Sequence, residues 1–215
     1  MRRSAICFAL VAVFAPATLG AAPADLAWDT AFRGQGPKAV HFTARAQDVR
    51  GASHNLEVWR DGADRLRRDT DGALSIVAEK QGDSHRFLVI DRGRRLRVHA
   101  RRETLLRLGV FSADFPTLAG RPRRPDAPHT VRALGKTAST PAGSCAFYRI
   151  EMVAGGGEDI CWSSTWGLPL EVRRLDGTTT FRVTSAEARL PSTAFRMDTD
   201  LADVDADRDI APTDD

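Results

Sequence analysis

The sequence has 215 residues, with 31 basic and 28 acidic side chains, five histidines and three cysteines. Its formal net charge of +3 falls to +1 if Arg2 and Arg3 are removed with a leader, because 29 basic residues then remain against 28 acidic ones. This near-neutral balance gives no reason to expect a nucleic-acid partner. The length is sufficient for one ordinary domain with its own hydrophobic core.

The first 24 residues have the chemistry of a secretory signal peptide. Two arginines precede an apolar run from Ala5 to Leu19, and Ala22-Pro23-Ala24 matches the small-residue pattern of a cleavage site. The run is too short to span a bilayer. The residue directly after the cleavage site is Asp25 instead of cysteine, so a lipid anchor has no acceptor thiol. We therefore expect an exported, periplasmic protein with one domain over residues 25–197.

The N-terminal half of that domain alternates apolar and polar residues in short runs, as strands of antiparallel sheets do. A short helical turn begins at Asp25, and a first strand begins at Ala39. Further strands are expected around 56–58, over 64–70, from 73, over 87–90 and over 96–100. Asp61-Gly62 and Asp71-Gly72 suit the tight turns that connect hairpin strands.

A leucine-rich segment interrupts this series of strands. Residues 102–108 are expected to form a short helix that ends at Gly109, and Val110, Phe111, Phe115 and Leu118 continue the apolar segment up to Gly120. The segment could line the entrance to a ligand site or simply close the core, and the sequence leaves both open. Residues 121–129 hold three prolines and three arginines, which favours an exposed, stiff connector.

The clearest alternation in the chain runs from Gly143 to Val183. Four strands, over 143–153, 158–164, 168–175 and 178–185, are separated by glycine-containing turns, which predicts an antiparallel meander. Cys145 and Cys161 lie on the arms of the first hairpin and roughly opposite each other if a small bulge corrects the register. A cross-strand disulfide is therefore expected, with two unrelated thiols as the alternative.

The last residues, 198–215, are mostly aspartate with small side chains, and we expect an acidic, disordered tail. Asp203, Asp205, Asp207 and Asp209 are spaced as in a calcium loop. However, Arg208 stands where an EF-hand needs glycine, and the twelfth residue is Asp214 instead of glutamate. A solvated tail is the better interpretation.

A long antiparallel sheet interrupted once by a leucine-rich segment, followed by Gly167-Leu168-Pro169-Leu170-Glu171-Val172 and Phe181-Arg182-Val183, resembles a known superfamily. It is similar to the periplasmic lipoprotein carriers of LolA and LolB type, which also include periplasmic regulators of envelope-stress sigma factors. The resemblance implies a mainly β fold, in which a curved antiparallel sheet forms a half-open barrel with a short N-terminal helix and a helical lid segment. The cysteine pair, the acidic tail and the arginine-rich connector depart from the carriers.

Two functions remain open. The first is a binding protein that holds an acyl chain or a lipoprotein lipid in the half-open barrel, and the second is an envelope interaction module without a cavity. The apolar residues expected to line the cavity are Val40, Phe42, Leu56, Val58, Ile76, Val89, Leu105, Phe111, Phe115, Ile150 and Trp162. An envelope protein or an anionic membrane surface could bind through Arg95, Arg97, Arg101 and Arg102, although these arginines could equally form a solvated sheet face.

An enzyme is not expected. The five histidines are scattered, and the sequence has no glycine-rich phosphate loop, no Gly-x-Ser-x-Gly and no Cys-His cluster. No cofactor or metal is predicted.

Overall fold

The computed structural model describes residues 25–34, 36–107, 114–197 and 200–209. Its main feature is a twelve-stranded sheet with the order β12-β6-β5-β4-β3-β2-β1-β11-β10-β9-β8-β7. The strands of the N-terminal half are β1 (Ala39–Gln47), β2 (Ser53–Asp61), β3 (Arg65–Thr70), β4 (Leu74–Gln81), β5 (Ser84–Asp91) and β6 (Leu96–Arg101). Those of the C-terminal half are β7 (His129–Thr140), β8 (Gly143–Met152), β9 (Gly157–Ser163), β10 (Leu168–Arg174), β11 (Thr179–Glu187) and β12 (Ala202–Asp205).

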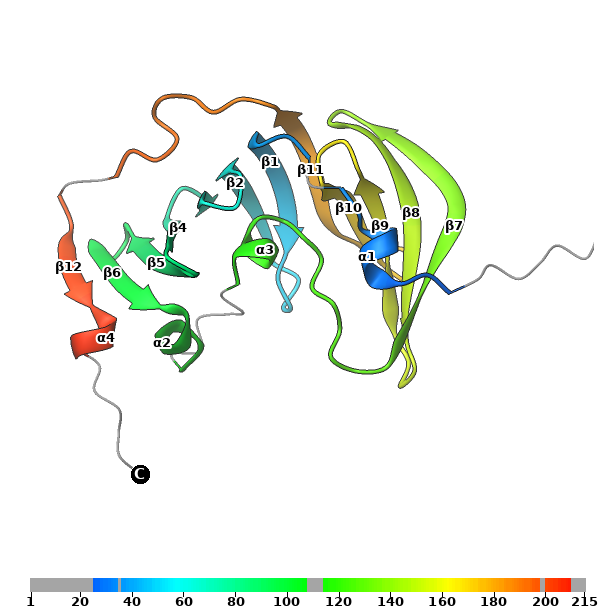
Figure 1. The fold of residues 1–215 in the computed structure, drawn as a ribbon, viewed down its shortest axis with the longest axis horizontal. Coiled ribbons are helices and arrows are strands. Elements are labelled where there is room, and N and C mark those ends of the chain that lie inside the picture. The colour runs from blue at the N-terminus through cyan, green and yellow to red at the C-terminus, as the bar shows by residue number, and fades with distance from the viewer. Residues whose placement is uncertain (1–24, 35, 108–113, 198–199, 210–215) are drawn as a thin grey trace, which may run out of the picture.

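The sheet curves into an open arch (Figure 1). Most neighbouring strands are hairpin partners in the sequence, and the two halves are joined where β1 pairs with β11. The strands β12 and β7 lie at opposite ends and do not pair with each other, so the barrel stays half open. The predicted fold class, a curved antiparallel sheet with few short helices, is confirmed.

Three short helices lie on the inner side of the arch: α1 (Trp28–Ala31), α2 (Arg102–Arg107) and α3 (Phe115–Leu118) (Figure 1). Phe115 and Leu118 of α3 and Leu105 of α2 are buried in the main core with Phe42, Leu66 and other inner side chains of β1–β5. Because alternate side chains of a strand point to opposite faces, the apolar set of each strand gathers on this inner side. None of the helices described here is long and apolar enough to cross a membrane.

A second cluster fills the inner side of the β7–β9 end. Phe32, which follows α1, packs with Val131, Ile150, Ile160 and Trp162. The indole Nε1 of Trp162 donates to the carbonyl oxygen of Arg33 at 2.8 Å, which fixes the helix against the sheet. This end of the arch is therefore closed by the N-terminal segment.

The disulfide between Cys145 and Cys161 is present, with their Cα atoms 5.2 Å apart. The strand register differs in detail from the expected one, because Cys161 stands opposite Phe147 and Ala146 stands opposite Trp162. The two cysteines are thus diagonal partners near the end of the ladder. The disulfide therefore joins β8 to β9 in the first hairpin of the meander.

Residues 200–209 correct part of the prediction of a disordered tail over 198–215; residues 198–199 and 210–215 lie outside the described residues. Residues 202–205 form β12, which pairs in parallel with β6, and α4 (Ala206–Asp209) follows. Arg97 Nε donates to Asp203 Oδ1 at 2.7 Å, and the backbone N–H of Ala202 donates to the carbonyl oxygen of Arg95 at 3.0 Å. A composition too polar to build its own core is thus ordered by basic side chains of another strand.

Candidate ligand groove on the inner face

A cavity of about 360 Å³ lies on the inner face of the sheet, between β1–β3 on one side and β9–β11 on the other. Residues 117–123, from α3 and the connector after it, form its remaining wall. We call this cavity the inner groove. Its strand residues are Phe42, Ala46, Gln47, Leu56, Val58, Arg68, Glu158, Ile160, Pro169, Val172, Thr180 and Phe181.

The register of the sheet explains why apolar side chains line up along the floor. Ile160 is opposite Val172, Val172 is opposite Phe181, and Phe181 is opposite Ala46, so one row crosses β9, β10, β11 and β1. Directly opposite residues share a face of the sheet. The floor is therefore a continuous apolar strip built from strands that are far apart in the sequence.

Several of these apolar side chains are not fully covered. Leu56, Val172 and Phe181 are half-buried, whereas Phe42 and Val58 beside them are buried. The groove thus has a packed base and an accessible apolar wall, the combination that a small ligand can exploit.

Arg68 is the unexpected member of the groove. In the register it stands between Val58 of β2 and Ile76 of β4, both of which are buried in the core. Its Nε is buried and has no hydrogen-bond partner, and no ion pair of this side chain occurs within the described residues. Burial lowers the pKa of its guanidinium, because the charged form loses hydration.

Arg60, on the same face of the sheet, differs from Arg68 because its guanidinium has a hydrogen-bond partner. It is 5% exposed, and its Nη2 donates to the carbonyl oxygen of Trp166 at 3.2 Å. Burial and the nearby charge of Arg121 lower its pKa. The guanidinium of Arg60 thus has a hydrogen-bond partner, whereas no hydrogen bond or ion pair of Arg68 occurs within the described residues.

Glu158 is the acidic counterpart at the β9 side of the groove. Burial raises the pKa of its carboxyl group, and the charge of Arg68 does not contribute to that shift. No ion pair joins the two side chains in the described structure. Because neither charge neutralises the other, each depends on its own surroundings.

The structure places the expected cavity residues in three groups. Phe42, Leu56 and Val58 line the inner groove. Val40, Ile76, Leu105 and Phe115 are buried in the main core, with Val89 packed at its edge, and Ile150 and Trp162 belong to the cluster around α1. Phe111 lies outside the described residues, as do residues 1–24 with the expected leader.

In the described structure, the tryptophans lie in the core or at its rim. Trp59 stacks on His41 on the outer face, with ring centroids 5.3 Å apart, and Trp166 donates to the carbonyl oxygen of Ala142 at 2.6 Å. Neither lines the inner groove. In the described ranges, no group of three or more His, Cys, Asp or Glu side chains is arranged to hold a metal ion.

Sequence reasoning missed Arg68 and Glu158, although a signal was present. Arg68 follows Leu66 at the strand period, so the alternation itself places it on the core face of β3. Glu158 precedes Ile160 and Trp162 in the same way. A charged residue at a core-facing position was the available clue.

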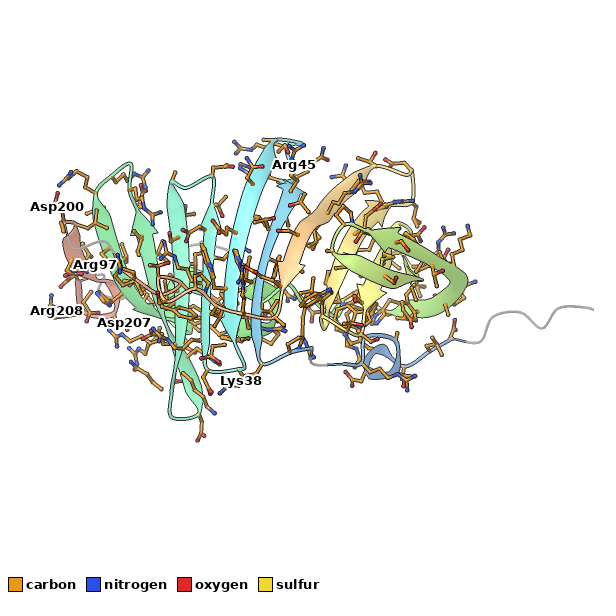
Figure 2. All side chains as sticks on the ribbon, turned by 90° about the horizontal axis from the view of Figure 1, so that it is seen from above. Lys38, Arg45, Arg97, Asp200, Asp207 and Arg208 are labelled. Atoms are coloured by element: carbon orange, nitrogen blue, oxygen red, sulfur yellow. A yellow bond between two sulfur atoms is a disulfide. The ribbon has the colours of Figure 1, made fainter. Side chains whose placement is uncertain are left out.

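The basic residues expected to contact a partner are largely occupied by the chain's own C-terminal segment. Arg95 Nη2 lies 2.6 Å from Asp200 Oδ2, Arg97 pairs with Asp203, and Arg101 Nε lies 3.3 Å from Asp207 Oδ2. Figure 2 shows Arg97, Asp200 and Asp207 together at the β12 end of the sheet. Arg102, at the start of α2, is exposed. Acidic groups of residues 200–207 therefore pair with three of the four arginines, although the side chains of Arg95 and Arg101 stay exposed.

No protein-family model matches this sequence, and a comparison with curated proteins finds no match. Solved structures that are similar to the chain include two that contain MucB. The crystal structure of MucB gives a TM-score of 0.45 at 14% identity, covering 81% of this chain and 62% of that one. The MucA/MucB complex of Pseudomonas aeruginosa gives a TM-score of 0.43 at 15% identity, covering 77% and 58%.

The likeness is one of overall fold. This chain spans about three fifths of the length of the chains it matches, and no residue of the inner groove is assigned from them.

Proposed function

We propose that this protein is an exported, periplasmic binding protein that holds an acyl chain in the inner groove. The observation that supports the proposal is the apolar strip across β9, β10, β11 and β1, which ends in half-buried side chains under the connector after α3. If this face served only as a packed core, larger side chains that filled the space would make the protein more stable.

The size and chemistry of the groove fit a small amphiphile. Its volume of about 360 Å³ falls near the lower end of the ~300–1,000 Å³ that ligand sites commonly have. Such a site accommodates one chain more readily than several. The ligand is either a free amphiphile or one acyl chain of a lipoprotein.

The direct test is a chain-length series. Saturated fatty acids of increasing length displace a neutral, environment-sensitive dye from the mature protein, and the dissociation constant is measured for each. Each buried methylene contributes about 0.8 kcal/mol, so affinity rises about fourfold per added carbon until the groove is full. Affinity independent of chain length would reject acyl-chain binding.

Ala46→Phe provides the matching variant. Ala46 lies on the floor of the groove, so a phenyl ring there occupies the ligand's space while its surroundings remain apolar. We expect a folded protein, judged by circular dichroism, that no longer binds fatty acid. The control is Arg45→Phe, because the neighbouring side chain is exposed on the other face of β1.

If the wild type shows no chain-length dependence, the protein is better described as an envelope interaction module. In that case its partner surface lies outside the groove. At Arg97 and Arg101 such a partner would compete with the aspartates of β12 and α4.

A further inference from the structure

The inner groove contains a positive charge for which the described chain provides no counter-charge. Arg68 extends from β3 among Val58, Leu66 and Ile76, and its Nε lacks a hydrogen-bond partner. Burying this guanidinium nitrogen without a partner is costly, because the nitrogen loses water and gains no hydrogen bond in return. A ligand that supplies an anionic hydrogen-bond acceptor for Arg68 would offset this cost.

None of the other described charged side chains of the groove provides a counter-charge for Arg68. Arg121 Nη2 donates to the carbonyl oxygen of Gly34 at 2.8 Å, and Arg123 Nη2 donates to Asp126 Oδ2 at 2.9 Å. Both are cations, as is Arg68 itself. Glu158 is the only acid among the described residues that line the groove, and its charge plays no part in the pKa shift of Arg68. The groove thus combines an apolar floor with a net positive lining.

We propose that the ligand is a single-chain anionic amphiphile, a fatty acid whose carboxylate pairs with the Arg68 guanidinium while its chain lies along the Ile160, Val172 and Phe181 strip. This inference rests on the proposed function, since it names the class of ligand for the same groove. It separates a free fatty acid from the lipid of a lipoprotein, whose acyl chains have no free carboxylate.

A carboxylate fits better than a phosphate for two reasons. The planar guanidinium fork matches the two oxygens of a carboxylate, and such charge-assisted pairs are strong when water is excluded. One arginine also balances one negative charge, whereas a phosphate monoester carries more than one near neutral pH. The groove has a single arginine without a partner among the described residues, so one carboxylate completes it.

The test compares palmitate with hexadecanol, which has the same chain and an uncharged head. Both displace a neutral fluorescent dye from the full mature protein, at concentrations below micelle formation. We expect the wild type to bind palmitate at least about tenfold more tightly, a difference of about 1.4 kcal/mol. Acetate, which has the head without the chain, is expected not to displace the dye.

Three variants locate the effect. Arg68→Met keeps the length of the side chain without its charge, and we expect about a tenfold loss of palmitate affinity with hexadecanol affinity unchanged. Arg68→Lys is expected to retain part of the preference, since it keeps the charge without the planar fork. Arg45→Met removes an exposed arginine from the other face of the sheet and should leave both affinities unchanged (Figure 2).

A second readout is independent of dye binding. Without ligand, Arg68→Met should melt at the same or a higher temperature than the wild type, because it removes a half-buried charge that has no counter-ion among the described residues. Palmitate should then raise the melting temperature of the wild type more than that of the variant.

The outcomes separate the two proposals. Equal affinity of the wild type for palmitate and hexadecanol, unchanged in Arg68→Met, would overturn the carboxylate pairing while leaving acyl-chain binding intact. Failure of both ligands to bind would reject the proposed function itself. A large drop in the melting temperature of ligand-free Arg68→Met would show that the guanidinium is needed by the fold, and would also overturn the inference.

Discussion

Glu158 and Arg68 face the inner groove as charged groups among apolar side chains, but burial acts on them in opposite directions. It raises the pKa of the glutamate and lowers the pKa of the arginine, because in each case the charged form loses hydration. A carboxyl group can escape that cost by taking up a proton within the ordinary pH range. A guanidinium stays charged, so it needs a counter-ion instead.

The protonation of Glu158 gives a pH-dependent prediction. Its pKa in the folded protein lies above the ordinary value of 4.5, so folding is favoured while the carboxyl group is protonated. Below pH 4.5 both states are protonated and the penalty is absent, and it grows as the pH rises through the raised pKa. Glu158→Gln should therefore be more stable than the wild type at pH 7, by on the order of 1 kcal/mol.

Urea denaturation at several pH values measures this effect. The stability difference between Glu158→Gln and the wild type should shrink as the pH falls toward 4.5. Glu151→Gln is the control, because the carboxylate of Glu151 pairs with Arg132 and its removal should give no gain at pH 7. A constant difference between Glu158→Gln and the wild type at every pH would mean that the carboxyl group is not penalised by burial.

The hairpins that tight turns connect are the part of the fold that can be predicted from the sequence. The Asp-Gly pairs end strands and start their neighbours, so the hairpins from β2 to β4 follow from a few adjacent residues. The pairing of β1 with β11 joins residues more than a hundred positions apart, and no local pattern encodes it. The meander is visible in the sequence, whereas the groove it encloses depends on this distant pairing.

The C-terminal segment shows even more clearly that a local pattern does not encode pairing between distant strands. Four residues, Ala-Asp-Val-Asp, have little strand propensity of their own, and their order depends on β6, about a hundred residues earlier. Composition alone therefore predicted disorder. In the same way, alternation places Arg68 on the core face, but only the packed structure shows that nothing described in the chain pairs with it.

Docking of β12 and α4 depends most on Asp207. Its side chain is 12% exposed and accepts hydrogen bonds from the backbone N–H of Arg101 at 3.0 Å and from Thr104 Oγ1 at 2.7 Å. Asp207→Ala leaves these donors without a partner, which costs about 1–3 kcal/mol. We expect the amides of β12 to exchange hydrogen faster in this variant, while those of β1 and β2 are unaffected.

Asp200→Ala is the matched control for the same segment. Asp200 pairs with Arg95, but its side chain is 90% exposed, and exposed ion pairs contribute about 0–1 kcal/mol. Its removal should change β12 exchange only slightly, and added salt should abolish even that effect. Equal effects of the two substitutions would show that general charge attraction, and not the hydrogen bonds of Asp207, holds the segment.

At the scale of the whole molecule, the inner groove joins parts of the sheet that come from opposite ends of the sequence. Its walls come from β1–β3 and from β9–β11, and residues 188–197 run over the outer side of the arch (Figure 1). Arg67 Nη1 donates to the carbonyl oxygen of Arg196 at 2.8 Å on that outer side. The inner face is therefore the side on which a ligand can contact both halves at once.

A ligand held between the two halves should stabilise the entire sheet. Binding to the folded state alone adds RT ln(1 + [L]/Kd), so palmitate at a hundredfold excess over its Kd should raise the free energy of unfolding by about 2.7 kcal/mol. The urea midpoint should rise with an unchanged slope, because the ligand alters stability and not the surface exposed on unfolding. Hydrogen exchange should slow in β2 and β3 as well as in β9 and β10. Ala46→Phe, with its groove filled, should show no shift; an equal shift in that variant would place the ligand outside the inner groove.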